Sequence, residues 1–66
     1  MLFYDYNTQN LHLRDKNEGT IVIYDTSGRL IKNMEVKNIL SLKDLENGVY
    51  YILLKETNNK LRIVKY

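Results

Sequence analysis

The stretch that decides the fold class runs from Thr20 to Val36 and reads TIVIYDTSGRLIKNMEV. Its first five residues are β-branched or aromatic, a composition that strands favour. Asp25 and Gly28 then predict a tight turn. An aspartate side chain can accept a hydrogen bond from a backbone N–H two residues on, and glycine adopts positive φ without steric cost. With residues 29–36 as the return strand, this stretch predicts a β-hairpin.

Apolar and polar residues continue to alternate with period two on both sides of the hairpin, as they do in half-buried strands. The further strands that this pattern predicts are residues 2–6, 11–13, 39–42, 49–56 and 61–66, with a corner at 43–48 and a turn at 57–60. About seven short strands without a helix are typical of a sandwich or a small barrel. We therefore predict one all-β domain over residues 1–66, a small immunoglobulin-like antiparallel β-sandwich.

Two strands carry more specific expectations. In the return strand, alternation should place one set of side chains together on one side: Leu30, Lys32, Met34 and Val36. In the strand at 49–56, six consecutive residues are apolar, so neither face is polar. That pattern predicts a central strand covered, at least partly, on both sides.

Composition excludes several classes of protein. A chain of 66 residues is one domain at most, and its core can give only modest stability. Without cysteine it has neither a disulfide nor a thiolate metal site. The ten basic residues are interleaved with eight acidic ones, whereas a nucleic-acid binder usually shows a basic stripe. No apolar run reaches about 18 residues, so we expect no membrane-spanning helix.

The first six residues, MLFYDY, do not form a signal peptide, because they lack a basic start and a long apolar stretch. If the domain works outside the cytoplasm, we expect its export signal to lie on something not present in this chain.

The residues that could carry chemistry have simpler structural explanations. His12 alternates with leucines and is expected to face solvent, and one histidine without cysteines does not make a usual zinc site. Asp44 and Glu46 share one loop but lack the calcium-loop signature, so a polar corner is the better interpretation. Ser27 lacks the glycine that precedes a nucleophile elbow. We expect no catalytic residue, no metal and no cofactor.

The tyrosines leave two interpretations open. There are six: Tyr4, Tyr6, Tyr24, Tyr50, Tyr51 and Tyr66. Tyr24 and Tyr50 are expected to fill the core with their hydroxyls at its rim. Alternatively, exposed tyrosines could form a platform for sugar rings, as in a small carbohydrate-binding module. A flat row of exposed rings would favour sugar binding, whereas buried or scattered rings would not.

Three blocks of the sequence, in order, resemble the type A C-terminal sorting domain of the type IX secretion system. They are residues 19–31, GTIVIYDTSGRLI, residues 40–53, LSLKDLENGVYYIL, and residues 61–65, LRIVK. Members of that family usually open with tyrosine–proline–asparagine–proline, whereas residues 4–8 here read YDYNT and the chain has no proline. The departure falls on the first predicted strand.

The resemblance implies that the domain is a non-catalytic targeting signal. The type IX machinery would read the folded domain after export to the periplasm, and a surface sortase would then remove it from an N-terminal cargo domain that this chain does not include. The cargo would be secreted or held at the cell surface. Recognition residues implied by the resemblance are Gly48, Tyr50, Arg62, Ile63, Val64 and Lys65, and the structural turn residues are Asp25, Gly28, Asn47 and Gly48.

Physically, such recognition needs an exposed strand edge or a terminal strand with which a partner can pair. The strand at 61–66 is the best candidate. Arg62 and Lys65 would either contact the machinery or be solvent-facing charges that protect an edge strand. A third function is a structural module that pairs through its strand edges, for example as a homodimer.

Overall fold

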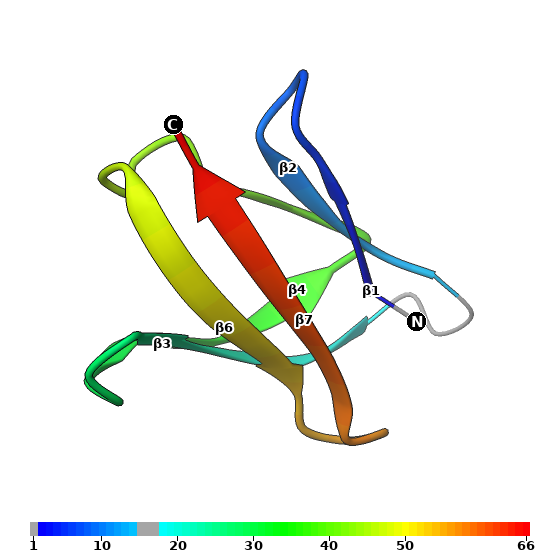
Figure 1. Ribbon diagram of the computed structural model, residues 1–66. Helices are drawn as coiled ribbons and strands as arrows, with labels where there is room; N and C mark the ends of the chain where they lie inside the picture. Colours follow the sequence, from blue (N-terminus) through cyan, green and yellow to red (C-terminus); the bar gives the residue numbers. More distant parts are fainter. Residues whose placement is uncertain (1, 15–17) are drawn as a thin grey trace.

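Seven strands and no helix make up the part of the chain that the computed structural model describes, residues 2–14 and 18–66 (Figure 1). The strands are β1 (Leu2–Asp5), β2 (Asn10–Leu13), β3 (Glu18–Asp25), β4 (Leu30–Lys37), β5 (Ile39–Ser41), β6 (Gly48–Leu54) and β7 (Asn59–Lys65). They form two antiparallel sheets, one in the order β1-β2-β5 and one in the order β4-β3-β6-β7. The predicted all-β sandwich of seven strands is confirmed. No helix in the described residues could cross a membrane.

The core lies between the two sheets, where alternate side chains of both sheets meet. It consists of Leu2, Tyr4, Leu11, Leu13, Ile21, Ile23, Val36, Leu42, Tyr50, Ile52, Leu54 and Ile63. Because β1 and β2 supply the first four of these, the amino-terminal hairpin is part of the sandwich despite the missing proline motif.

The hairpin of β3 and β4 contains an irregularity that the alternation pattern did not predict. The pairing runs from Glu18 opposite Lys37 to Tyr24 opposite Leu30, with a register shift between Ile23 and Tyr24. Two residues then oppose one, as at a β-bulge. Leu30 was expected on the same side of the strand as Val36, but Val36 is buried whereas Leu30 is 51% exposed, and Ile31 packs against the core instead.

β6 is a central strand, as predicted, with β3 on one side and β7 on the other. Tyr50, Ile52 and Leu54 point into the core. The opposite face is covered only in part, because Tyr51 is 46% exposed. The strand ends at Leu54, two residues before the predicted end, and the turn occupies residues 55–58.

A single residue, Asn38, joins β4 to β5 and so carries the chain from one sheet to the other. Its φ is 59°, in the left-handed region that asparagine tolerates better than most residues. Its carbonyl accepts a hydrogen bond from the Leu13 amide at 2.8 Å. On the opposite side of the sandwich, β1 lies beside β7 without joining its sheet.

Candidate functional site: the corner and the C-terminal strand

The loop between β5 and β6, residues 42–47, turns a corner at one end of the sandwich, and we call it the corner. Leu42 is fully buried and Leu45 packs against the core, so two leucines anchor the loop to the core. The Leu42 amide donates to the Gln9 carbonyl at 2.9 Å, and the Leu45 amide donates to the Leu42 carbonyl at 3.2 Å. The corner therefore has a fixed backbone path rather than that of a loose surface loop.

Tyr50 fixes the far side of the corner. Its ring is buried in the core, and its hydroxyl donates to the Glu46 carbonyl at 2.6 Å. The expectation that Tyr50 fills the core with its hydroxyl at the rim is confirmed. Between these two residues, Asn47 is exposed in a bend and Gly48 has a φ of 152°, a backbone conformation that favours glycine.

Lys65 reaches the corner from β7. Its side chain is only 6% exposed, and its ammonium donates to the Leu42 carbonyl at 2.5 Å and to the Leu45 carbonyl at 2.6 Å. Figure 1 shows the end of β7 next to the loop that leads into β6. Lys65 is therefore not a solvent-facing charge on an edge strand. It points inward because it shares a face of β7 with Ile63, which is fully buried.

The six residues implied in recognition thus divide by environment. Tyr50, Ile63 and Lys65 are buried, whereas Arg62 is exposed and Gly48 and Val64 are half-buried. Val64 lies opposite Val49, and Gly48 lies opposite Lys65, so β7 and the start of β6 bring all six together. Residues 48–50 and residues 62–65, which are separated by at least 12 positions in the sequence, meet here.

Comparison with known proteins assigns the chain to a family. Residues 6–65 match the model of the secretion system C-terminal sorting domain. The chain belongs to this family. No curated protein and no solved structure gave a match. The sorting domain is a non-catalytic signal of type IX secretion, its family interacts with the type IX machinery, and the cargo of the family is secreted or carried at the cell surface.

The turn of the sorting domain at residues 25–29 is built around one carboxylate. Asp25 Oδ1 accepts hydrogen bonds from the Ser27 amide at 3.0 Å, the Ser27 hydroxyl at 2.7 Å and the Arg29 amide at 2.9 Å. The Gly28 amide donates to the Asp25 carbonyl at 3.1 Å, and Gly28 has a φ of 83°. Hydrogen bonds from the Ser27 hydroxyl and then the Arg29 amide lower the pKa of Asp25.

We expect the sorting domain to lose stability in acid. The pKa of Asp25 is lower in the folded state, so its ionised form stabilises the fold above the ordinary aspartate pKa of about 4, and this contribution is lost as pH falls through the lowered value. Hydrogen bonds lower the pKa values of Asp5, Asp44 and Glu56 in the same direction. Urea midpoints should be constant from about pH 7 to pH 5 and fall below about pH 4.

The Asp25→Asn variant should show a smaller fall between pH 5 and pH 3 than the unmodified domain, because one of the four carboxylates no longer titrates. An equal fall in both proteins would contradict the role of Asp25.

The other charged candidates have structural partners. The Asp44 carboxylate accepts a hydrogen bond from the Lys32 ammonium at 2.9 Å, which ties the corner to β4. His12 is half-buried, and its ring centre lies 5.8 Å from that of Phe3 on the neighbouring strand. Among the described residues, no group of three or more histidine, aspartate or glutamate side chains could hold a metal ion.

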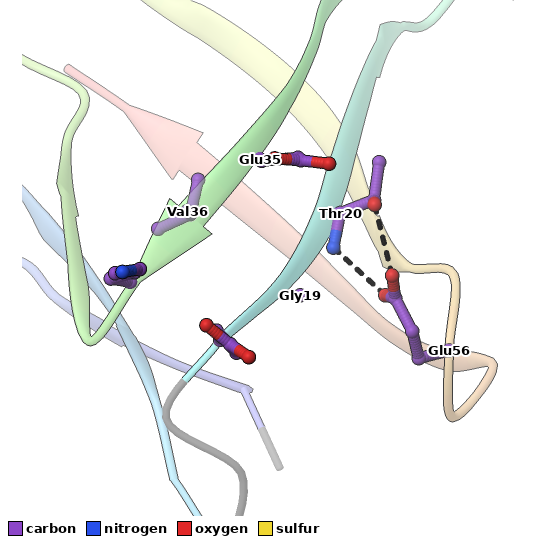
Figure 2. Close-up of a pocket in the computed structure, with 7 residues that line it drawn as sticks. Gly19, Thr20, Glu35, Val36 and Glu56 are labelled. Atoms are coloured by element: carbon purple, nitrogen blue, oxygen red, sulfur yellow. Dashed lines mark hydrogen bonds between the residues drawn. The ribbon is translucent and has the colours of Figure 1, made fainter.

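Three glutamates, Glu18, Glu35 and Glu56, are among the residues that line a hollow at the opposite end of the sorting domain. Figure 2 shows the Glu56 carboxylate turned toward Thr20, and it accepts hydrogen bonds from the Thr20 amide at 2.8 Å and the Thr20 hydroxyl at 2.9 Å. Gly19 permits this closure, because a Cβ there would lie 2.5 Å from Leu54 Cδ1 and 3.0 Å from Glu56 Oε1. Glu56, in the turn after β6, therefore links this turn to β3 through two hydrogen bonds.

The tyrosines occupy three places. Tyr4 and Tyr50 are buried. Tyr24 was expected in the core but is 36% exposed, because its neighbour Ile23 takes the inward position, and it lies opposite Tyr51 on the outer face of the larger sheet. Tyr6 and Tyr66 stack with ring centres 6.4 Å apart, between the β1–β2 turn and the end of the chain.

Proposed function

We propose that the type IX machinery reads this sorting domain through the outward-facing side of β7, with Arg62 and Val64 as the contacting side chains. The observation that supports the proposal is the position of β7 at the edge of the larger sheet, with β6 as its only hydrogen-bonded neighbour among the described strands. Ile63 and Lys65 point inward from the same strand, so they set the orientation of Arg62 and Val64 without meeting the partner.

The other edge of the larger sheet is less suited to recognition. β4 carries the bulge near Leu30, and a bulge on an edge strand discourages pairing with another chain, whereas β7 pairs with β6 without a register shift. Charge does not separate the two edges, because β4 carries Lys32, Glu35 and Lys37 and β7 carries Lys60 and Arg62. The difference in register between the edges supports β7 as the surface that is read.

A cargo joined on the amino-terminal side is compatible with the positions of β1 and β7. Figure 1 shows the start of β1 and the end of β7 on different sides of the molecule. A folded cargo joined before Leu2 would leave the corner and the end of β7 accessible to the machinery. We propose that the cargo reaches the cell surface through the periplasm, and that a surface sortase removes the sorting domain there.

A secretion assay with two matched variants tests the contact with β7. The domain is fused behind a folded reporter that carries a periplasmic export signal, in a bacterium that has a type IX machine. We propose an acidic group of the machinery as the partner of Arg62. Arg62→Glu would then place like charges together, which costs several kcal/mol at an interface, so the exported fraction should fall at least roughly tenfold. Lys55→Glu makes the same charge change at an exposed position in the turn before β7 and should be exported normally.

Reporter protein is measured in the medium, on the surface and in the periplasm, and the circular dichroism spectrum of each purified variant shows whether it is folded. Normal export of folded Arg62→Glu protein would refute the contact.

One observation favours carbohydrate binding as a second candidate function. Leu30, Tyr24, Tyr51 and Arg62 lie opposite one another in a row across all four strands of the larger sheet. Two of them are exposed tyrosine rings on neighbouring strands. Titration with oligosaccharides, followed by tyrosine fluorescence, tests this candidate. The double variant Tyr24→Ala, Tyr51→Ala is the control. If oligosaccharide changes the fluorescence of neither protein, this candidate is excluded.

A further inference from the structure

Hydrogen bonds connect the corner to four other parts of the fold. The Gln9 carbonyl, in the β1–β2 turn, accepts from the Leu42 amide. Tyr50 of β6 holds the Glu46 carbonyl, Lys32 of β4 holds the Asp44 carboxylate, and Lys65 of β7 holds two carbonyls. Both sheets therefore contribute to the position of one short loop.

Of the two lysines among these ties, Lys65 is unusual because it is buried. A buried ammonium is costly, and a well-packed apolar side chain of similar volume is often at least as stabilising. An ammonium, however, carries three donors and can hold two carbonyls at once. The Lys65 side chain therefore fixes where the Leu42 and Leu45 carbonyls lie, which an apolar side chain could not do.

We infer that Lys65 and Tyr50 are positioning residues that lock the corner to the C-terminal strand, and that the corner is part of the surface read by the type IX machinery. This inference rests on the proposed function, in which the machinery reads β7, and extends the contact from that strand to the loop beside it. The exposed side chains that the lock presents are Lys43, Asp44, Glu46 and Asn47.

The neighbouring tyrosines extend this surface. Tyr66 follows Lys65 directly and is 92% exposed, and its ring stacks on that of Tyr6, which is 52% exposed. The polar corner and these two rings lie at the end of the sandwich where β7 ends. A partner that fits this surface needs polar groups for the corner and an apolar or aromatic group for the rings. The surface is complete only when β7 is paired with β6, because Lys65 and Tyr66 come from the end of that strand.

Two variants with matched controls test the lock. Lys65→Met removes the ammonium and Lys55→Met is its exposed control in the turn before β7, while Tyr50→Phe removes one buried hydroxyl and Tyr51→Phe is its exposed control. Amide hydrogen exchange, followed residue by residue by NMR, should become about tenfold faster at Leu42 and Leu45 when a tie is lost, with β3 unchanged. The exported fraction in the secretion assay should fall several-fold in both test variants and in neither control.

Each outcome decides the inference. Faster exchange in the corner with normal export would show that the corner is not read, and unchanged exchange would show that these side chains do not position it. If Lys65→Met does not fold, Tyr50→Phe decides alone, because it retains the ring in the core. Failure of export in the Lys65→Met and Tyr50→Phe variants alongside normal export of Arg62→Glu would refute the β7 contact and leave the corner in place. Normal export of the Lys65→Met and Tyr50→Phe variants alongside failed export of Arg62→Glu would overturn the inference about the corner and leave the β7 contact in place.

Discussion

Replacing Ile63 with alanine is expected to unfold most of the sorting domain at room temperature. Ile63 is fully buried and lies in the core next to residues from both sheets. Truncating a buried isoleucine costs about 2–5 kcal/mol, and the core of a domain this small supplies only about 3–5 kcal/mol. Urea unfolding followed by circular dichroism should show the loss of a cooperative transition.

Val64→Ala is the matched control for this prediction, because Val64 is the next residue of β7 but is half-buried on the opposite face. It should shift the urea midpoint only slightly. A loss of less than about 1 kcal/mol in the Ile63→Ala variant would contradict the predicted burial.

This prediction affects how the signal can be mapped. Deleting residues 61–66 removes Ile63 from the core and Lys65 from the corner together. Loss of export after such a deletion therefore does not separate a lost contact from a lost fold. Substitutions of exposed side chains, such as Arg62→Glu, leave the core intact and separate the two.

The second large effect is expected at Tyr4, which tests where the domain begins. The family match starts at residue 6, yet Tyr4 of β1 is 6% exposed and belongs to the core. Tyr4→Ala should lower the free energy of unfolding by about 3 kcal/mol or more, since truncating a buried aromatic ring leaves a large cavity. Phe3→Ala, on the exposed face of the same strand, should cost much less.

Urea unfolding of the two variants side by side decides the matter. Equal stability of Tyr4→Ala and Phe3→Ala would mean that β1 is an accessory strand and that the folding unit starts after it. The proposal that residues 1–66 form one domain would then be wrong.

Much of the fold could be predicted from the sequence because the strands alternate with period two and the turns carry recognisable residues. The hairpin around Asp25 and Gly28, the central position of β6 and the strand at the end of the chain all follow from these local signals. The bulge at Leu30 and Ile31 could not be predicted, because it depends on how β4 fits against β3 rather than on any local residue preference.

The candidate site was only partly predictable for a related reason. The resemblance to the family indicated the residues, but not which of them are inside. A signal for Lys65 was nevertheless present, since Leu61, Ile63 and Lys65 alternate on one face of β7 and the first two are apolar. The preference of lysine for the surface concealed it. The two carbonyls that hold the ammonium belong to residues 20 and 23 positions earlier, a pairing that only the folded structure shows.

The one-residue connection at Asn38 has a consequence for how sequences of this kind can vary in length. Side chains alternate along a strand, so inserting a single residue there would slip the register of β5 and exchange its two faces. Leu40, which packs against the core, would turn outward, and Ile39, which is 50% exposed, would turn inward. Insertions and deletions should therefore be excluded between β4 and β5 and accumulate instead in turns such as residues 55–58, where extra length changes no pairing.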